Sequence, residues 1–222
     1  MDYGSVISNS FEYTRDALVG KWMQWIILAV LALVQTITFL LIPLLCGYVV
    51  RVLAGNAPAP EVNEWGRLFV DGWKMNIIAL VYMIPIFVII AFLMFLTIVV
   101  GDGNPTLALG LLGIGLLLMF IVAIIMAFIL PFALVRFAHT DSVNEAFNIS
   151  AILSHIGQLG WGTWIIAVIV LIVVAFVYGF VVGIIGMIPL LGFIITLFLN
   201  VAFAVFYGRY LALVYEDTPA PA

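Results

Sequence analysis

Four long apolar runs constrain this sequence more than any other feature. A helix crosses the hydrocarbon core of a bilayer with about 20 apolar residues, because in lipid the backbone must satisfy its own hydrogen bonds. Four runs are at least that long, and none alternates as a barrel strand would. They lie at about residues 75–100, 106–135, 161–185 and 191–215. The sequence therefore predicts the all-α class and, within it, a polytopic membrane helix bundle.

The composition agrees with a membrane protein and excludes several other classes. Hydrophobic residues make up 67% of the 222 residues and charged residues 8%, whereas soluble domains are about half apolar and a quarter charged. Seven Lys and Arg against eleven Asp and Glu argue against nucleic acid as a partner. One cysteine and two histidines are too few ligands for a zinc or haem site, so no metal or other cofactor is expected.

The first apolar run, Trp22–Leu53, is open to two interpretations. As one helix it would be about 48 Å long, and it would place the polar stretch at residues 35–38 in hydrocarbon. As a hairpin, Trp22–Val34 enters the membrane, residues 35–38 turn and Phe39–Leu53 returns. Each arm would then be only about 20 Å long, so the hairpin should be re-entrant or thin the bilayer locally. The hairpin is the preferred interpretation, and it gives about six membrane segments in three hairpins.

The basic residues predict the orientation of the chain in the cell membrane. The connections at residues 101–105 and 186–190 contain no Lys or Arg, so they should face outside, because cytoplasmic loops carry the excess of basic residues. With the hairpin, both termini and all seven basic residues are cytoplasmic. With one long span, Arg15 and Lys21 would lie outside instead.

The three hairpins divide a single membrane domain, residues 1–222, into similar units. These units cover residues 5–54, 60–137 and 141–215, and a C-terminal tail follows at residues 216–222. The similarity is one of hydropathy and charge. It reflects either a true internal repeat or hairpins that simply return to the basic side of the membrane.

Each unit opens with an amphipathic stretch that is expected to lie in the membrane interface. The stretches are Ser5–Leu18, Glu61–Lys74 and Ser142–Ile156. In the third stretch, Ser142 and Glu145 match the capping box that begins many helices. The sequence thus predicts three interfacial helices on the cytoplasmic side.

The segment between about residues 40 and 90 resembles a known family. Its characteristic residues are Gly47-Tyr48-Val49-Val50-Arg51-Val52-Leu53-Ala54-Gly55, Pro60, Glu64-Trp65, Leu68-Phe69-Val70-Asp71-Gly72-Trp73-Lys74, Tyr82 and Pro85. This stretch is similar to the uncharacterised, largely archaeal family of prokaryotic membrane proteins called domain of unknown function 4013. The resemblance implies a multi-pass membrane protein, and it brings no known activity, ligand or catalytic residue.

No constellation of residues in the sequence supports catalysis. Ser154 and His155 are adjacent in a predicted helix, where neighbouring side chains diverge. An intramembrane aspartyl site needs two carboxylates that share it, and the apolar arms hold no such pair. Phosphate-binding and dinucleotide-binding motifs are also absent. We therefore expect a protein that is not an enzyme and has no catalytic residue.

Three arginines are the most informative charges. Arg51, Arg136 and Arg209 each lie within a turn or two of the predicted cytoplasmic end of an arm. One interpretation is that they set the topology, extend their head groups to the interface and pair with nearby acids. The other is that they form a ring that binds lipid phosphate head groups or the acidic tail of a partner, because guanidinium suits phosphate.

Two polar residues inside the last apolar run are the other candidates. Thr196 and Asn200 share one face of the predicted helix at a spacing of four residues. Polar groups inside the bilayer are expensive and often functional. The preferred interpretation is a hydrogen bond between helices, and the alternative is contact with a substrate.

These features predict an integral membrane protein of unknown pathway. It should act without catalysis, as a scaffold, a complex subunit or a lipid-organising protein. The alternative is a small-solute transporter or channel whose path would reach Thr196 and Asn200. The expected partners are membrane lipids, together with another membrane protein or a second copy of the chain.

Overall fold

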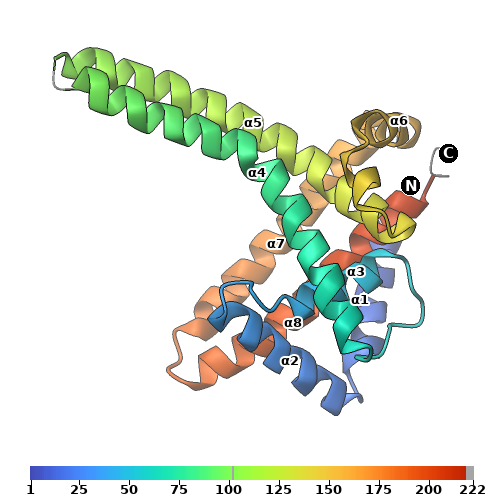
Figure 1. The fold of residues 1–222 in the computed structure, drawn as a ribbon. Coiled ribbons are helices and arrows are strands. Elements are labelled where there is room, and N and C mark those ends of the chain that lie inside the picture. Colours follow the sequence, from blue (N-terminus) through green and yellow to red (C-terminus); the bar gives the residue numbers. More distant parts are fainter. Residues whose placement is uncertain (102, 219–222) are drawn as a thin grey trace.

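The computed structural model describes residues 1–101 and 103–218, and all regular structure within them is helical, which confirms the all-α class. Residues 219–222 of the predicted tail lie outside the described residues. In chain order the helices are α1 (Tyr3–Leu18), α2 (Trp22–Ile37), α3 (Leu44–Leu53), α4 (Trp65–Gly101), α5 (Pro105–Thr140), the 3₁₀ helix η1 (Val143–Phe147), α6 (Ile149–Leu159), α7 (Trp161–Gly186) and α8 (Leu191–Glu216) (Figure 1).

The four predicted membrane runs all lie in long helices. α4, α5, α7 and α8 are long and apolar enough to cross a membrane, with mean hydropathies of 3.0, 3.0, 3.3 and 2.1. α4 and α5 have 37 and 36 residues, or about 55 Å each, against a hydrocarbon core of about 30 Å. The chain is therefore a multi-pass helical membrane protein.

The first apolar run forms two helices, so the alternative of one long span is wrong. α2 and α3 are separated by a turn at residues 38–43, whereas the sequence predicted the turn at 35–38. The polar residues Gln35 and Thr36 lie inside α2 and do not end it, and the Thr36 hydroxyl donates to the carbonyl of Ala32 at 2.8 Å. α2 and α3 have 16 and 10 residues. At about 24 and 15 Å, each is shorter than the hydrocarbon core.

Two of the three predicted interfacial stretches form separate helices. α1 corresponds to the first stretch, and a bend of 100° separates it from α2. α6 contains most of the third stretch. The second stretch does not form a separate helix, because residues 65–74 are the first turns of the continuous helix α4, and its position in the interface stays a prediction. No proline or other strong helix breaker separates Lys74 from the apolar run that follows it.

The capping box predicted at Ser142 and Glu145 is not formed. Ser142 precedes η1 and makes no side-chain capping bond. Asn148 caps α6 instead, because its side chain accepts a hydrogen bond from the amide of Ala151 at 3.2 Å. The Glu145 carboxylate binds Arg136, so an ion pair takes the place of the capping contact.

The molecule consists of a packed base and two apolar arms. The base is residues 1–18, 44–82, 128–168 and 201–218, the long arm is residues 83–127 of α4 and α5, and the short arm is residues 169–200 of α7 and α8. Figure 1 shows both arms leaving the base and diverging, while the chain ends and α6 lie away from the arm tips. Within the described residues, the buried members of both apolar clusters come from the base and from α2.

Two glycines bring α3 and α4 into close contact inside the base. A Cβ atom on Gly47 would lie 1.9 Å from the carbonyl oxygen of Leu68, and one on Gly72 would lie 1.9 Å from the carbonyl oxygen of Pro43. Only glycine allows backbones to approach this closely. The reciprocal contacts show that α3 and α4 run antiparallel here, and they fix the turn before α3 against α4.

Candidate functional site

The Arg51 guanidinium is bound by the loop that follows its own helix. It donates to Asn63 Oδ1 at 2.7 Å and to Glu64 Oε2 at 3.2 Å. The Arg51 side chain is only 12% exposed, so these contacts replace water around most of the charge. Arg51 therefore holds the loop between α3 and α4 against the end of α3.

Arg136 forms the most buried ion pair of the base. Its Nε donates to Glu145 Oε2 at 2.8 Å, and a second guanidinium nitrogen contacts the same oxygen. Arg136 is 5% exposed, and a buried guanidinium needs a paired carboxylate to offset its desolvation. This pair fastens η1 to the end of α5.

Arg209 joins three parts of the chain. Its guanidinium donates to the carbonyl of Gly55 at 3.3 Å and lies 5.0 Å from the centre of the Tyr13 ring. A cation over an aromatic ring at this distance is attracted by the ring quadrupole. Arg209 of α8 thus contacts both α1 and the loop after α3. The three arginines bind different acceptors of their own chain, and their contact with a head group or partner stays a prediction.

Four further charges form a cluster where α4 meets the end of α5. Lys74 Nζ lies 3.3 Å from Asp71 and 3.1 Å from Asp141, while Arg67 lies 3.6 Å from Asp71 and 3.7 Å from Asp141. The Asp71 side chain is 7% exposed, so it is the member that most needs its cations. The family-like segment, which contains three of these four residues, therefore builds the base.

Asn200 connects the two helices of the short arm. Its Oδ1 accepts a hydrogen bond from the hydroxyl of Tyr178 on α7, which supports the role of pairing helices. Thr196 lies one turn earlier on α8, and its hydroxyl is buried with no partner among the described residues. Contact of either residue with a substrate stays a prediction.

The turn between α2 and α3 binds its own backbone amides, which a turn in hydrocarbon requires. The amides of Phe39, Leu40 and Leu41 donate to carbonyls of residues 35–38 at 2.9–3.2 Å. The Ile42 amide donates to Thr38 Oγ1 at 3.2 Å, and the Cys46 amide donates to Gln35 Oε1 at 3.1 Å. The polar residues of this run thus supply acceptors that water supplies in an ordinary loop.

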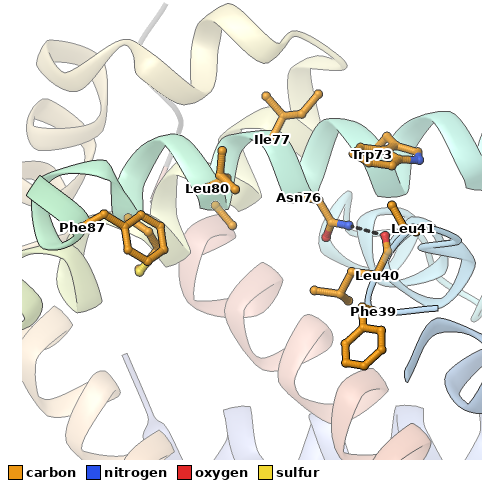
Figure 2. Close-up of a pocket in the computed structure, with 10 residues that line it drawn as sticks. Phe39, Leu40, Leu41, Trp73, Asn76, Ile77, Leu80 and Phe87 are labelled. Carbon is orange, nitrogen blue, oxygen red and sulfur yellow. Dashed lines mark hydrogen bonds between the residues drawn. The ribbon is translucent and has the colours of Figure 1, made fainter. Parts of the chain in front are cut away.

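Asn76 of α4 completes the turn from outside. Its side-chain nitrogen donates to the carbonyl of Leu40 at 3.2 Å (Figure 2). Phe39 and Leu40 have positive φ angles of 49° and 66°, a conformation that costs a residue with a side chain on the order of 1 kcal/mol. The hydrogen bonds around the turn offset this cost and hold the two residues in place.

An apolar pocket lies between this turn and α4. It has a volume of about 400 Å³. Figure 2 shows residues 39–41 on one side of it, with Trp73, Leu80 and Phe87 following along α4. Asn76 is the one polar residue that lines it, and its amide nitrogen is engaged by Leu40. We call this pocket the tip groove.

Sequence reasoning missed Asn76. Asn76 stands at the edge of the apolar run that begins near residue 75. A polar side chain so close to Lys74 looks like part of the polar segment before that run. An asparagine at the edge of a predicted span was the available signal, because polar groups inside the bilayer are often functional. The partner carbonyl, however, is determined only by the folded contact between α3 and α4.

Comparison with known proteins places the chain in a family. The model of a family described as "Protein of unknown function (DUF4013)" matches residues 30–187. This range contains α3, α4, the tip groove and the whole long arm. No curated protein and no solved structure matches the chain.

Proposed function

Because this chain belongs to the DUF4013 family, whose function is unknown, we propose a role from its own geometry: it is a non-enzymatic membrane protein that organises the lipids around it. The division into base and arms carries this proposal. The charges of the described chain, apart from Lys21, gather in the base and largely pair with one another. The arms present apolar side chains outward over two long hairpins, and such a surface is stable only against hydrocarbon.

We place the base at the cytoplasmic face of the cell membrane, with both termini on that side. α2 and α3 are each too short to cross the hydrocarbon core, so they enter from the cytoplasmic side and return to it. The amides of the turn at residues 38–42 all have acceptors within the chain, which supports this placement, because an exposed loop can use water instead. The chain is then re-entrant once and crosses the membrane four times.

The three arginines serve this role by fastening the base. Arg51 and Arg136 each hold a connecting segment against a helix end, and Arg209 joins α8 to α1. A rigid base keeps the two arms at a fixed divergence within the bilayer. Lipid between the arms is then confined by protein on two sides.

Labelling of engineered cysteines tests the placement. In a Cys46→Ala background, Phe39→Cys should stay unlabelled by a membrane-impermeant maleimide added to either side. Val19→Cys should react only from the cytoplasmic side and Ile188→Cys only from outside. Reaction of Phe39→Cys from outside would show that the first hairpin crosses the membrane.

Electron spin resonance of labelled lipids tests the role itself. Vesicles that contain spin-labelled phosphatidylglycerol should show a motionally restricted lipid component when the protein is present. The lipids should be recovered chemically unchanged by mass spectrometry. A spectrum without the restricted component, or lipids that are converted to a product, would overturn the proposal.

A further inference from the structure

An open polar pocket lies where α2 begins. It has a volume of about 720 Å³, which is within the range of about 300–1,000 Å³ that is usual for small-ligand sites. Its lining comes from two parts of the chain: residues 20–24 and Ile27 belong to the bend and the start of α2, and Glu61 and Val62 belong to the loop between α3 and α4. We call it the corner pocket, because the chain bends there by 100° between α1 and α2.

Two opposite charges line the corner pocket and do not pair with each other. Lys21 and Glu61 are both exposed. Within residues 1–101 and 103–218, neither side chain forms an ion pair. The neighbouring Arg51 contacts the backbone carbonyl of Glu61 at 3.4 Å, but its ion pair is with Glu64. The pocket therefore holds one cation and one anion that are free to bind a ligand.

Hydrogen bonds between α2, α3 and the loop fix the position of the two charges. The side-chain nitrogen of Gln24 donates to the carbonyl of Pro60 at 3.1 Å and to the hydroxyl of Tyr48 at 3.2 Å. The Tyr48 hydroxyl donates to the same carbonyl at 3.1 Å. Pro60 directly precedes Glu61 in the sequence, and Gln24 lies three residues after Lys21. The walls of the pocket are thus held together without a ligand, which lowers the cost of binding one.

The apolar side chains beside the pocket indicate that the ligand is a lipid. Val19, Trp22 and Met23 are 55%, 61% and 72% exposed, and they flank Lys21 in the sequence. The rings of Trp22 and Trp25 stack with their centres 5.7 Å apart, and tryptophan is enriched at the level of the lipid head groups. A phospholipid fits this surface, because its head group can enter the pocket while its acyl chains cover the apolar side chains.

The two charges select a head group that carries both signs. The Lys21 ammonium attracts a phosphate, but Glu61 repels a ligand that is only negative, such as inorganic phosphate or phosphatidylglycerol. Phosphatidylethanolamine offers a phosphate to Lys21 and a primary ammonium, with N–H groups, to Glu61. Phosphatidylcholine carries the same charges, but its quaternary ammonium has no N–H group to donate. The pocket therefore distinguishes lipids by charge and by hydrogen bonding.

We propose that the corner pocket is a binding site for the phosphoethanolamine head group of a phospholipid in the cytoplasmic leaflet. Lys21 binds the phosphate, Glu61 binds the ammonium, and the acyl chains lie along the exposed face of α2 beyond Met23. This site names a lipid for the proposed lipid-organising role, and it rests on the proposed placement of the base at the cytoplasmic face.

Native mass spectrometry of the full chain in detergent tests the site. The protein is titrated with phosphatidylethanolamine, phosphatidylcholine or phosphatidylglycerol that have the same acyl chains. It should bind phosphatidylethanolamine about fivefold more tightly than either of the others, which is the effect expected of one charged hydrogen bond.

Two soluble competitors identify the source of the head group. Glycerophosphoethanolamine has the same head group without acyl chains, so it should displace the lipid only at about 100-fold higher concentration, because it cannot cover the apolar side chains. Inorganic phosphate should not displace it. Displacement by either compound at the concentration of the lipid itself would identify a soluble ligand and overturn the assignment to a lipid.

Two charge variants and their matched controls complete the test. Lys21→Gln and Glu61→Gln should each weaken the binding of phosphatidylethanolamine by about fivefold. Glu61→Gln should also strengthen the binding of phosphatidylglycerol, because it removes the repulsion. Arg15→Gln and Glu12→Gln remove the same charges from α1 outside the pocket and should leave all three affinities unchanged. All four residues are exposed, so the variants should keep the unfolding midpoint of the wild type.

The outcomes separate this site from the proposed function. Equal affinities for the three lipids, or an equal loss of affinity in a pocket variant and its control, would overturn the site. Restricted spin-labelled lipid would persist in that case, and the lipid-organising role would stand without a defined head-group site. Loss of the restricted component, with the preference for phosphatidylethanolamine intact, would overturn the broader role instead.

Discussion

The base and the long arm share helices α4 and α5, but their apolar side chains pack in different ways. Ile78 and Ile98 lie on α4, twenty residues apart, and Ile78 is fully buried while Ile98 is 72% exposed. The base packs its apolar side chains against one another, as a soluble domain does. The long arm packs one helix against one other and leaves the remaining faces to the solvent, which for such a surface is lipid.

This difference shows where sequence tolerance lies. A residue in the base contacts several segments that are distant in sequence, so a change there disturbs a shared structure. A residue on the outer face of the long arm contacts lipid, which adapts to its shape. Matched substitutions in the two regions should therefore differ in their effect on the free energy of unfolding.

The largest difference in the free energy of unfolding between the two regions is expected when glycines are replaced by alanine. Gly47→Ala places a Cβ atom 1.9 Å from the Leu68 carbonyl oxygen, so α3 and α4 must separate. We expect a loss of about 3 kcal/mol or more, seen as a lower midpoint in thermal unfolding of the detergent-solubilised protein. Gly113→Ala is the control in the long arm, because its added Cβ would meet no neighbouring helix or side chain within 4 Å. Equal midpoints for the two variants would contradict the packed base.

Loss of the buried ion pair should come next. Arg136→Gln removes the guanidinium and leaves the Glu145 carboxylate, whose side chain is 32% exposed, without its main partner. We expect a loss of about 2 kcal/mol in the same unfolding assay, because removal of one member of a buried pair is costly. Arg15→Gln is the control, since Arg15 and Asp16 are 57% and 70% exposed and such pairs contribute about 0.5 kcal/mol. An unchanged midpoint for Arg136→Gln would show that this pair does not support the base.

His155 should make the stability of the base depend on pH. Burial lowers the pKa of His155 below its ordinary value of 6.5, and the nearby charge of Arg136 lowers it further, while hydrogen bonds to the backbone oppose the shift. At low pH the unfolded chain binds a proton at His155 more readily than the folded chain does. The free energy of unfolding therefore falls as the pH drops below about 6.5. His155→Leu should flatten this part of the profile between pH 7 and 5. A parallel profile for the variant would assign the acid sensitivity to other groups.

The sequence predicted the parts of the fold that the bilayer dictates. The four spans follow from hydropathy, because lipid leaves a helix no other way to satisfy its backbone. The turn between α2 and α3 was predicted from Gln35 and Thr38, and both side chains do serve that turn. Its position moved because Thr36 and Gln35 remained helical.

The contacts of the base were beyond prediction from sequence. The number of charged residues was evident, but the residues with which they pair were not. Glu145 pairs with Arg136 and does not form the predicted capping box with Ser142. Lys74 pairs with Asp141, which is 67 residues away. The close approach at Gly47 and Gly72 likewise depends on where two helices cross. Such pairings are set by tertiary packing, which no local pattern of residues contains.

The smallest test concerns the one polar contact of the tip groove. Asn76→Leu removes the donor to the Leu40 carbonyl and leaves that oxygen without its side-chain partner. We expect a loss of about 0.6 kcal/mol, a typical value for a hydrogen bond between membrane helices, measured as the shift of the unfolding midpoint. Thr97→Val is the control, because the Thr97 hydroxyl donates at 2.8 Å to Leu93 of its own helix and that carbonyl also serves the helix backbone.

Asn76→Leu combined with Phe39→Cys separates two roles of Asn76. If Asn76 only stabilises the turn, Asn76→Leu lowers the midpoint and Phe39→Cys in that background stays unlabelled from both sides. If Asn76 also keeps the turn at its depth in the membrane, the turn moves when Asn76 is replaced. Phe39→Cys then becomes accessible to the impermeant maleimide. Because Leu40 is held at a positive φ angle of 66°, the turn has strain to release, and we expect the second result.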